Sequence, residues 1–247
     1  MLRIYWQNKI RFNWIFGLIL ILALGIPRFF IVLNANDTGR YGNISILFLI
    51  MCLTPFIFLT KEGRRKTGMV KPVSYLWMFY SFLTGASFCL LVCSTGILLY
   101  KHTDSNWFVY ISKSYQSAGI ISTESQRLTY FLIYSIAGIT FSPLGEELFY
   151  RGIVHGSFVE KFGEQKASMI DSMAFALTHL AHFGIIYMAR TWHFLLIPAL
   201  IWVIFMFTAS RIFFICKVKT GSIIGSVISH AAFNLTMMYF IFYHILE

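Results

Sequence analysis

The sequence predicts an all-α polytopic membrane protein, a helix bundle with about seven or eight transmembrane helices. Of its 247 residues, 57% are hydrophobic and only 12% are charged, and the mean hydropathy is +0.70. A soluble domain carries about 25% charged residues, so this chain has too few polar side chains to cover a globule in water. Phenylalanine occurs 26 times, which suits lipid-facing surface. Composition therefore excludes an ordinary soluble enzyme.

Apolar stretches of membrane-spanning length are the second observation. A helix needs about 20 apolar residues to cross the hydrocarbon core. Seven stretches approach this length, at residues 14–33, 43–60, 73–100, 128–158, 167–189, 193–215 and 221–245. The longest polar stretch, 101–127, is expected to be an exposed extracytoplasmic loop. We expect one integral membrane domain, in which residues 1–127 supply N-terminal helices and this loop, and residues 128–247 supply the helices that carry motifs.

Basic residues predict the orientation. The chain has 20 Lys and Arg against 10 Asp and Glu, with a net charge of +10. A cytoplasmic N-terminus puts most of these bases on the cytoplasmic side, as the positive-inside rule requires. The bases lie in short stretches between apolar segments, so membrane lipids and not nucleic acid are the expected partners. We expect a multi-pass protein of a plasma membrane, of bacterial origin because the chain is compact and carries no appended domain.

Ionisable residues inside the predicted spans are the main functional signal, because each costs roughly 2.5–3.5 kcal/mol at the bilayer centre. The first group is Glu146 and Glu147, followed by Arg151. Glu147 and Arg151 are four residues apart on one helix face and are expected to pair. Glu146 is then left without a local partner. Taken alone, a surface ion pair at a helix end explains this group equally well.

Two further polar groups lie on later spans. Phe175 and His179 share one helix face, and His182, one turn further, is expected to be structural. His230 and Asn234 share another face, and Asn offers two donors and one acceptor. Polar contacts between helices explain each group alone. They do not explain why the polar side chains of all three spans are expected in one layer, roughly 12–18 Å from the same membrane side at 1.5 Å per residue.

Together these groups resemble the three motifs of the CAAX-protease and bacteriocin-processing (CPBP or Abi) family of intramembrane proteases. The motifs are Glu-Glu-x-x-x-Arg at 146–151, Phe-x-x-x-His at 175–179 and His-x-x-x-Asn at 230–234. The resemblance covers about residues 128–245, and residues 1–127 carry no motif. It implies a bundle of about eight helices around an intramembrane cavity that opens toward the cytoplasmic side.

The resemblance also implies roles for individual residues. Glu146 and His179 are expected to activate the attacking water. His230 and Asn234 are expected to form the oxyanion site. The supporting residues are Glu147, Arg151 and Phe175. The implied activity is an intramembrane endopeptidase, of glutamic type, whose substrate is a peptide or protein, for example a prenylated protein or the precursor of a secreted peptide.

Several alternatives stay open. Glu146, His179 and His230 form a known type of catalytic zinc set, although a metal-free site without cofactor is favoured because Asn234 suits oxyanion donation better than zinc binding. A catalytically silent immunity or scaffold protein of the same family is another alternative. A transporter with an ion path through the same residues is a third. Arg28, which follows Pro27 inside the first span, is interpreted as snorkelling to an interface in preference to pairing with a buried carboxylate.

Overall fold

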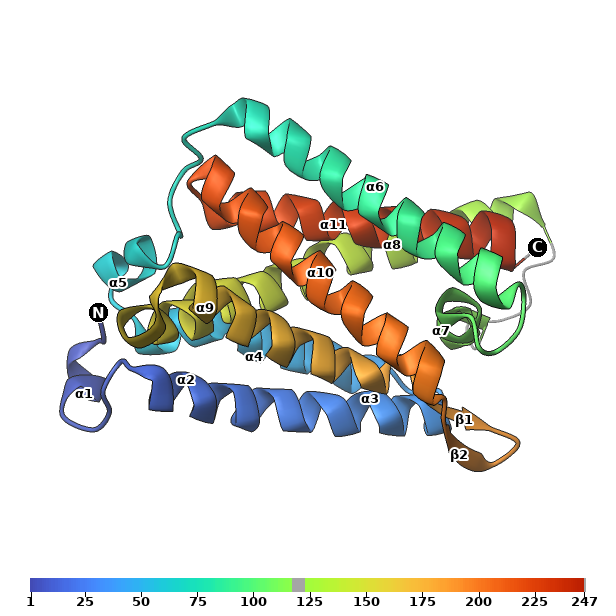
Figure 1. Cartoon of the computed structure of the whole chain (residues 1–247), viewed down its shortest axis with the longest axis horizontal. Coiled ribbons are helices and arrows are strands. Elements are labelled where there is room, and N and C mark those ends of the chain that lie inside the picture. Colours follow the sequence, from blue (N-terminus) through green and yellow to red (C-terminus); the bar gives the residue numbers. More distant parts are fainter. Residues whose placement is uncertain (117–122, 247) are drawn as a thin grey trace.

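The computed structural model describes residues 1–116 and 123–246, and its long helices run roughly along one axis (Figure 1). The N-terminus and the C-terminus lie at opposite ends of this axis. The short helices α1 and α5 lie at the N-terminal end, and α7 and a small hairpin lie at the other. The predicted all-α polytopic bundle is confirmed.

The first half of the chain contains three long apolar helical segments and several short helices. In order these are α1 (Ile4–Gln7), α2 (Trp14–Leu20), the π-helical turn η1 (Ile21–Gly25), α3 (Ile26–Thr38), α4 (Gly42–Phe58), α5 (Lys61–Lys66), α6 (Tyr75–Tyr100) and α7 (Trp107–Gln116). Pro27 at the start of α3 lacks an amide hydrogen and crowds the carbonyl group four residues before it. This local conflict explains why the helix widens into a π turn just ahead of the proline.

The second half contains the helices that carry the motifs. In order these are α8 (Glu124–Glu146), the π-helical segment η2 (Glu147–Val154), α9 (His155–Thr178), the 3₁₀ turn η3 (His179–Ala181), β1 (Ile185–Met188), β2 (Thr191–Phe194), α10 (Leu196–Thr220), α11 (Ile223–Phe240) and the π turn η4 (Ile241–Ile245). Inside α9, Gly163 has a φ of +73°, so two helices meet there and the chain turns.

Five helical stretches in the described part of the chain are long and apolar enough to cross a membrane. They are Trp14–Thr38, Tyr75–Tyr100, Glu124–Ala181, Leu196–Thr220 and Ile223–Ile245. The third has 58 residues and includes the turn at Gly163, and Gly42–Phe58 is a shorter apolar helix. The helices therefore follow the predicted apolar stretches closely, with two exceptions.

The first exception is the end of the predicted span 167–189, where the expected helix is wrong. Helical structure ends at Ala181, and β1 then pairs with β2 in an antiparallel hairpin. Ala189 and Arg190, which join the strands, have φ values of 49° and 65°. A two-residue turn with positive φ at both positions matches the twist of a hairpin. Gly184, at a φ of 113°, allows the chain to leave the helix.

The second exception is the predicted exposed loop 101–127, because part of it is a packed helix. Trp107 at the start of α7 is fully buried and stacks on Trp202 of α10, with ring centroids 6.1 Å apart. The apolar side chains of α7 bury one face of an otherwise polar segment, which an average over the stretch conceals. Residues 117–122 of this stretch lie outside the described residues.

Two glycines allow the helices around the centre of the bundle to approach closely. A Cβ atom at Gly145 of α8 would lie 2.5 Å from the carbonyl oxygen of Phe48 in α4. A Cβ atom at Gly85 of α6 would lie 2.0 Å from the carbonyl oxygen of Ser229 in α11. Only glycine fits such backbone contacts. They hold α8 and α11, which carry the first and third motifs, against their neighbours.

Candidate active site

The first motif lies where α8 changes into η2. Glu146 ends the α-helix, Glu147 begins the π-helical segment, and both side chains are completely buried. The predicted pair is present, with Glu147 Oε2 lying 3.2 Å from Arg151 Nε. Glu147 Oε1 lies 2.8 Å from Nδ1 of His230. Glu147 therefore joins the first motif to the third, a contact that the sequence did not indicate.

The aromatic ring of Phe175 lies between the motifs. The guanidinium carbon of Arg151 is 4.4 Å from the centroid of this ring, a distance at which a cation is attracted to the ring face. The same ring also lies near both histidines. Its centroid is 4.2 Å from the ring centroid of His179 and 5.8 Å from that of His230. The ring of Phe175 thus contacts both the guanidinium of Arg151 and the ring of His179.

The hydrogen bonds of His179 define which of its nitrogens can accept a proton. Nδ1 lies 2.7 Å from the carbonyl oxygen of Phe175. A carbonyl oxygen only accepts, so Nδ1 carries the hydrogen and Nε2 is left with a lone pair. Trp202 Nε1 donates to the backbone oxygen of His179 and fixes the turn that carries the ring.

The third motif presents one imidazole and one carboxamide. His230 stacks on Phe213 at 4.7 Å and directs Nδ1 to Glu147, so Nε2 is the ring nitrogen that this contact leaves available. Nδ2 of Asn234 donates to the backbone oxygen of Gly138 at 2.9 Å. A carboxamide nitrogen has two hydrogens, and this bond uses one of them.

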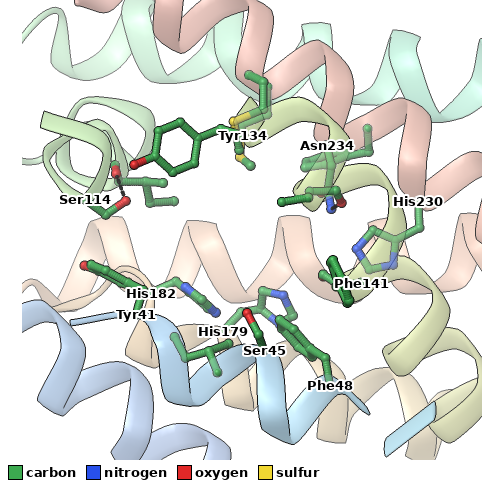
Figure 2. A pocket seen from close by; sticks show the side chains of 18 of the residues that line it. Tyr41, Ser45, Phe48, Ser114, Tyr134, Phe141, His179, His182, His230 and Asn234 are labelled. Atoms are coloured by element: carbon green, nitrogen blue, oxygen red, sulfur yellow. Dashed lines mark hydrogen bonds between the residues drawn. The ribbon is translucent and has the colours of Figure 1, made fainter. Parts of the chain in front are cut away.

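A cavity of about 500 Å³ brings these groups together. Figure 2 shows His179 and His182 across the cavity from His230 and Asn234. The remaining wall is largely apolar and includes Ile44, Phe48, Phe141, Met206, Phe233, Met237 and Met238. Catalytic-type polar groups on a mostly apolar wall are typical of a binding site for a small or extended ligand.

Glu146 does not line this cavity, whereas Arg28 does. Glu146 Oε1 lies 2.5 Å from Nη2 of Arg28 and 3.4 Å from the hydroxyl of Ser142. Glu146 Oε2 is buried and has no hydrogen-bond partner among the residues that the structure describes. In this state the first carboxylate is therefore reached from the cavity through Arg28 and Ser142.

The favoured interpretation of Arg28 as a snorkelling side chain is wrong. Its side chain is 1% exposed and forms a buried ion pair with a residue 118 positions away. A charged residue inside an apolar span, next to a proline, was the available signal. That signal indicates a partner without identifying it.

The cavity extends toward the end of the bundle that carries α7. Tyr41, Ser114 and Tyr115 line it there, and a smaller pocket with Tyr187 and Lys113 adjoins it. This end is opposite α1 and α5 (Figure 1). If the N-terminus is cytoplasmic, the end of the bundle that carries α7 is extracytoplasmic. The predicted cytoplasmic N-terminus and the predicted cytoplasmic opening of the cavity then point to different sides. The cytoplasmic opening stays a prediction.

The zinc alternative has little support in the donor set. Within the described ranges, no three His, Cys, Asp or Glu side chains gather so that they could hold a metal ion. Glu146 is bound to the guanidinium of Arg28, and Nδ1 of His230 is bound to Glu147. A cation bound at Glu146 would have to displace another cation.

A known protein family matches part of the second half of the chain. Residues 128–236 match the family described as type II CAAX prenyl endopeptidase Rce1-like. The matched range contains all three motifs, and Arg28 lies outside it. No curated protein and no solved structure matches the chain. The match confirms the resemblance to the CAAX-protease and bacteriocin-processing family.

Proposed function

Since residues 128–236 match the Rce1-like family of type II CAAX prenyl endopeptidases, we propose that the chain is an intramembrane endopeptidase that hydrolyses a peptide bond in the cavity between α9 and α11. The observation that carries this proposal is that His179, whose Nε2 has a lone pair, and Asn234, whose amide has a second N–H, line one cavity from opposite sides. A proton acceptor opposite an oxyanion donor is the arrangement that acyl transfer to water requires.

The proposed first step is attack by water. His179 Nε2 and Glu146 together act as the general base. They take one proton from the water while the water oxygen bonds to the scissile carbonyl carbon. Glu146 does not line the cavity in the described state, so its side chain must rotate, or Arg28 must shift, before the carboxylate contacts that water. The same proton then passes to the leaving nitrogen as the C–N bond breaks. The products are one carboxylic acid and one amine.

The proposed second element is stabilisation of the oxyanion. Asn234 donates its second N–H to the developing negative charge. His230 donates from Nε2 only when the ring carries both protons, and the carboxylate of Glu147 at Nδ1 stabilises such a ring. Donors of this kind lower a barrier by about 2.7–4 kcal/mol each. This scheme uses no metal, because Arg28 already supplies the positive charge at Glu146.

The apolar wall of the cavity supports a substrate class. A peptidase family implies a peptide or protein substrate, and we propose that the segment next to the scissile bond is apolar or lipid-modified. The methionine and phenylalanine side chains of the wall would contact such a segment. A charged segment would gain little there, since burying charge without a partner is costly.

The test is a cleavage assay with purified protein in detergent and in lipid nanodiscs. The substrates are matched peptides with a C-terminal cysteine motif, one prenylated and one not, and mass spectrometry identifies the products. We expect cleavage at one bond, and a fall in kcat of about 10²–10⁴ for His179→Ala. The control is His102→Ala, which alters an exposed histidine outside the cavity.

Other outcomes separate the alternatives. Binding of both peptides without any cleavage would favour the silent scaffold or immunity protein. Cleavage that stops in chelator and returns with zinc would favour the metal site. Ion flux in liposomes without cleavage would favour a transporter. Equal cleavage by wild type and His179→Ala would remove His179 from the mechanism.

A further inference from the structure

Arg28 is a buried cation at the candidate site. It lies on α3, outside the matched range and outside all three motifs. Nevertheless it lines the cavity beside His179, and its guanidinium contacts residues of both α8 and α9. These contacts connect the first span to the two helices that carry the first and second motifs.

The contacts of one nitrogen atom link the two groups that would activate water. Nη2 of Arg28 lies 2.5 Å from Glu146 Oε1 and 3.4 Å from His179 Nε2. These two acceptors therefore cannot lie farther apart than the sum of the two distances. Since a guanidinium only donates, both acceptors direct lone pairs at one point.

The other end of the guanidinium is also fixed. Nη1 donates to the hydroxyl of Thr178, which in turn donates to the backbone oxygen of Phe175. The planar fork of an arginine holds both contacts in one fixed geometry. Arg28 thus orients Glu146 relative to the helix turn that carries His179.

Arg28 also compensates the negative charge of Glu146. Glu146 is completely buried, and Arg28 is its only cationic partner among the described residues. A buried carboxylate without a counter-ion is strongly destabilising, and removing one member of a buried pair leaves such a charge behind. Neither Arg151 nor Lys217 forms a contact of this kind with Glu146: Arg151 pairs with Glu147, and Lys217 donates to a backbone oxygen.

We propose that Arg28 is a positioning residue of the active site, which holds Glu146 and His179 on one guanidinium and supplies the counter-charge that Glu146 needs. This inference rests on the proposed peptidase function for its kinetic part only. It means that the site is not complete within the matched range, because a residue of the first span completes it.

The first experiment is a stability cycle that does not depend on activity. Thermal unfolding is measured in one detergent for wild type, Arg28→Gln, Glu146→Gln and the double variant. We expect each single variant to unfold at a lower temperature than wild type, and the double variant to unfold at a higher temperature than Arg28→Gln alone, because it has no unpaired charge. Additive losses in the double variant would overturn the pairing. Arg40→Gln, at an exposed arginine, is the matched control and is expected to behave like wild type.

The second experiment separates positioning from a general loss of folding. Arg28→Lys keeps the charge but loses the fork, so we expect it to unfold close to wild type. We expect its kcat to fall at least tenfold and that of Arg28→Gln about 100-fold, with KM within about threefold, as misplacement of a catalytic group requires. Unchanged or increased kcat in both variants would overturn the proposal. If wild type cleaves no peptide, the proposed function fails, and the stability cycle still decides whether Arg28 is the partner of Glu146.

Discussion

Replacing Glu147 with glutamine removes one negative charge and leaves the shape of the side chain almost unchanged. Glu147 is fully buried, with Arg151 Nε at 3.2 Å from one oxygen and His230 Nδ1 at 2.8 Å from the other. The variant therefore keeps the hydrogen-bond acceptor for His230 and removes the counter-charge of Arg151. It tests whether this carboxylate holds the first and third motifs together.

The magnitude follows from burial. Breaking a buried ion pair by removing one partner costs about 3–5 kcal/mol. Arg151 keeps its contacts with the rings of Phe175 and Phe213, at 4.4 Å and 5.4 Å, and these partly offset the loss. We therefore expect the lower end, about 3 kcal/mol. At roughly 2–4 °C per kcal/mol for a chain of this size, the midpoint should fall by roughly 6–12 °C.

The kinetic effect should be comparable in free energy with the stability effect, since a 100-fold fall in kcat corresponds to about 2.7 kcal/mol. Without a carboxylate at Nδ1, His230 loses the group that stabilises a protonated ring, and loss of an equivalent acid in a histidine–carboxylate pair costs up to about 10⁴ in kcat. We expect kcat to fall at least 100-fold for folded Glu147→Gln. The matched control is Glu124→Gln, which alters an exposed glutamate paired with Arg127 at 3.1 Å. If Glu147→Gln unfolds within 1 °C of the control and has the same kcat as the control, this reasoning is refuted.

Three further variants test the cavity, the helix packing and a second buried pair. Asn234→Asp keeps the side-chain size but replaces the amide donor, so we expect kcat to fall about 10²–10³-fold in the cleavage assay, with binding of peptide retained. Gly145→Ala would put a Cβ atom 2.5 Å from a carbonyl oxygen of α4, and we expect a loss of about 1–3 kcal/mol in chemical unfolding; Gly42→Ala, which meets nothing within 4 Å, should unfold like wild type. Asp171→Asn removes the charge that lies 2.8 Å from Nδ1 of the buried His155, and a loss of about 1.5–3 kcal/mol is expected. An unchanged midpoint in Asp171→Asn would show that this bond contributes no net stability.

The helices and the motif residues could be predicted because both depend on short-range patterns. Membrane spans require runs of about 20 apolar residues, which are visible in the sequence. Residues four apart share a helix face, so the pair of Glu147 with Arg151 needed no tertiary information. The same spacing places His230 and Asn234 on one helix face, and both line the cavity together with His179, whereas Glu146 does not line it.

The remaining features depend on contacts that no local pattern contains. Arg28 and Glu146 are 118 positions apart, and nothing in the spacing of either residue identifies the other. The packed helix α7 was missed because its few apolar side chains lie within a polar stretch. The hairpin of β1 and β2 was missed because its apolar residues continue the composition of the preceding span, and only backbone angles distinguish the two.

The distribution of charge explains why the first motif needs two adjacent acids. Neighbouring residues on a helix point about 100° apart, so Glu146 and Glu147 cannot share one partner. Glu146 pairs with Arg28, and Glu147 pairs with Arg151, which gives two carboxylates and two guanidiniums with no net charge in a buried layer. A neutral set is less costly in a bilayer than any odd number of charges.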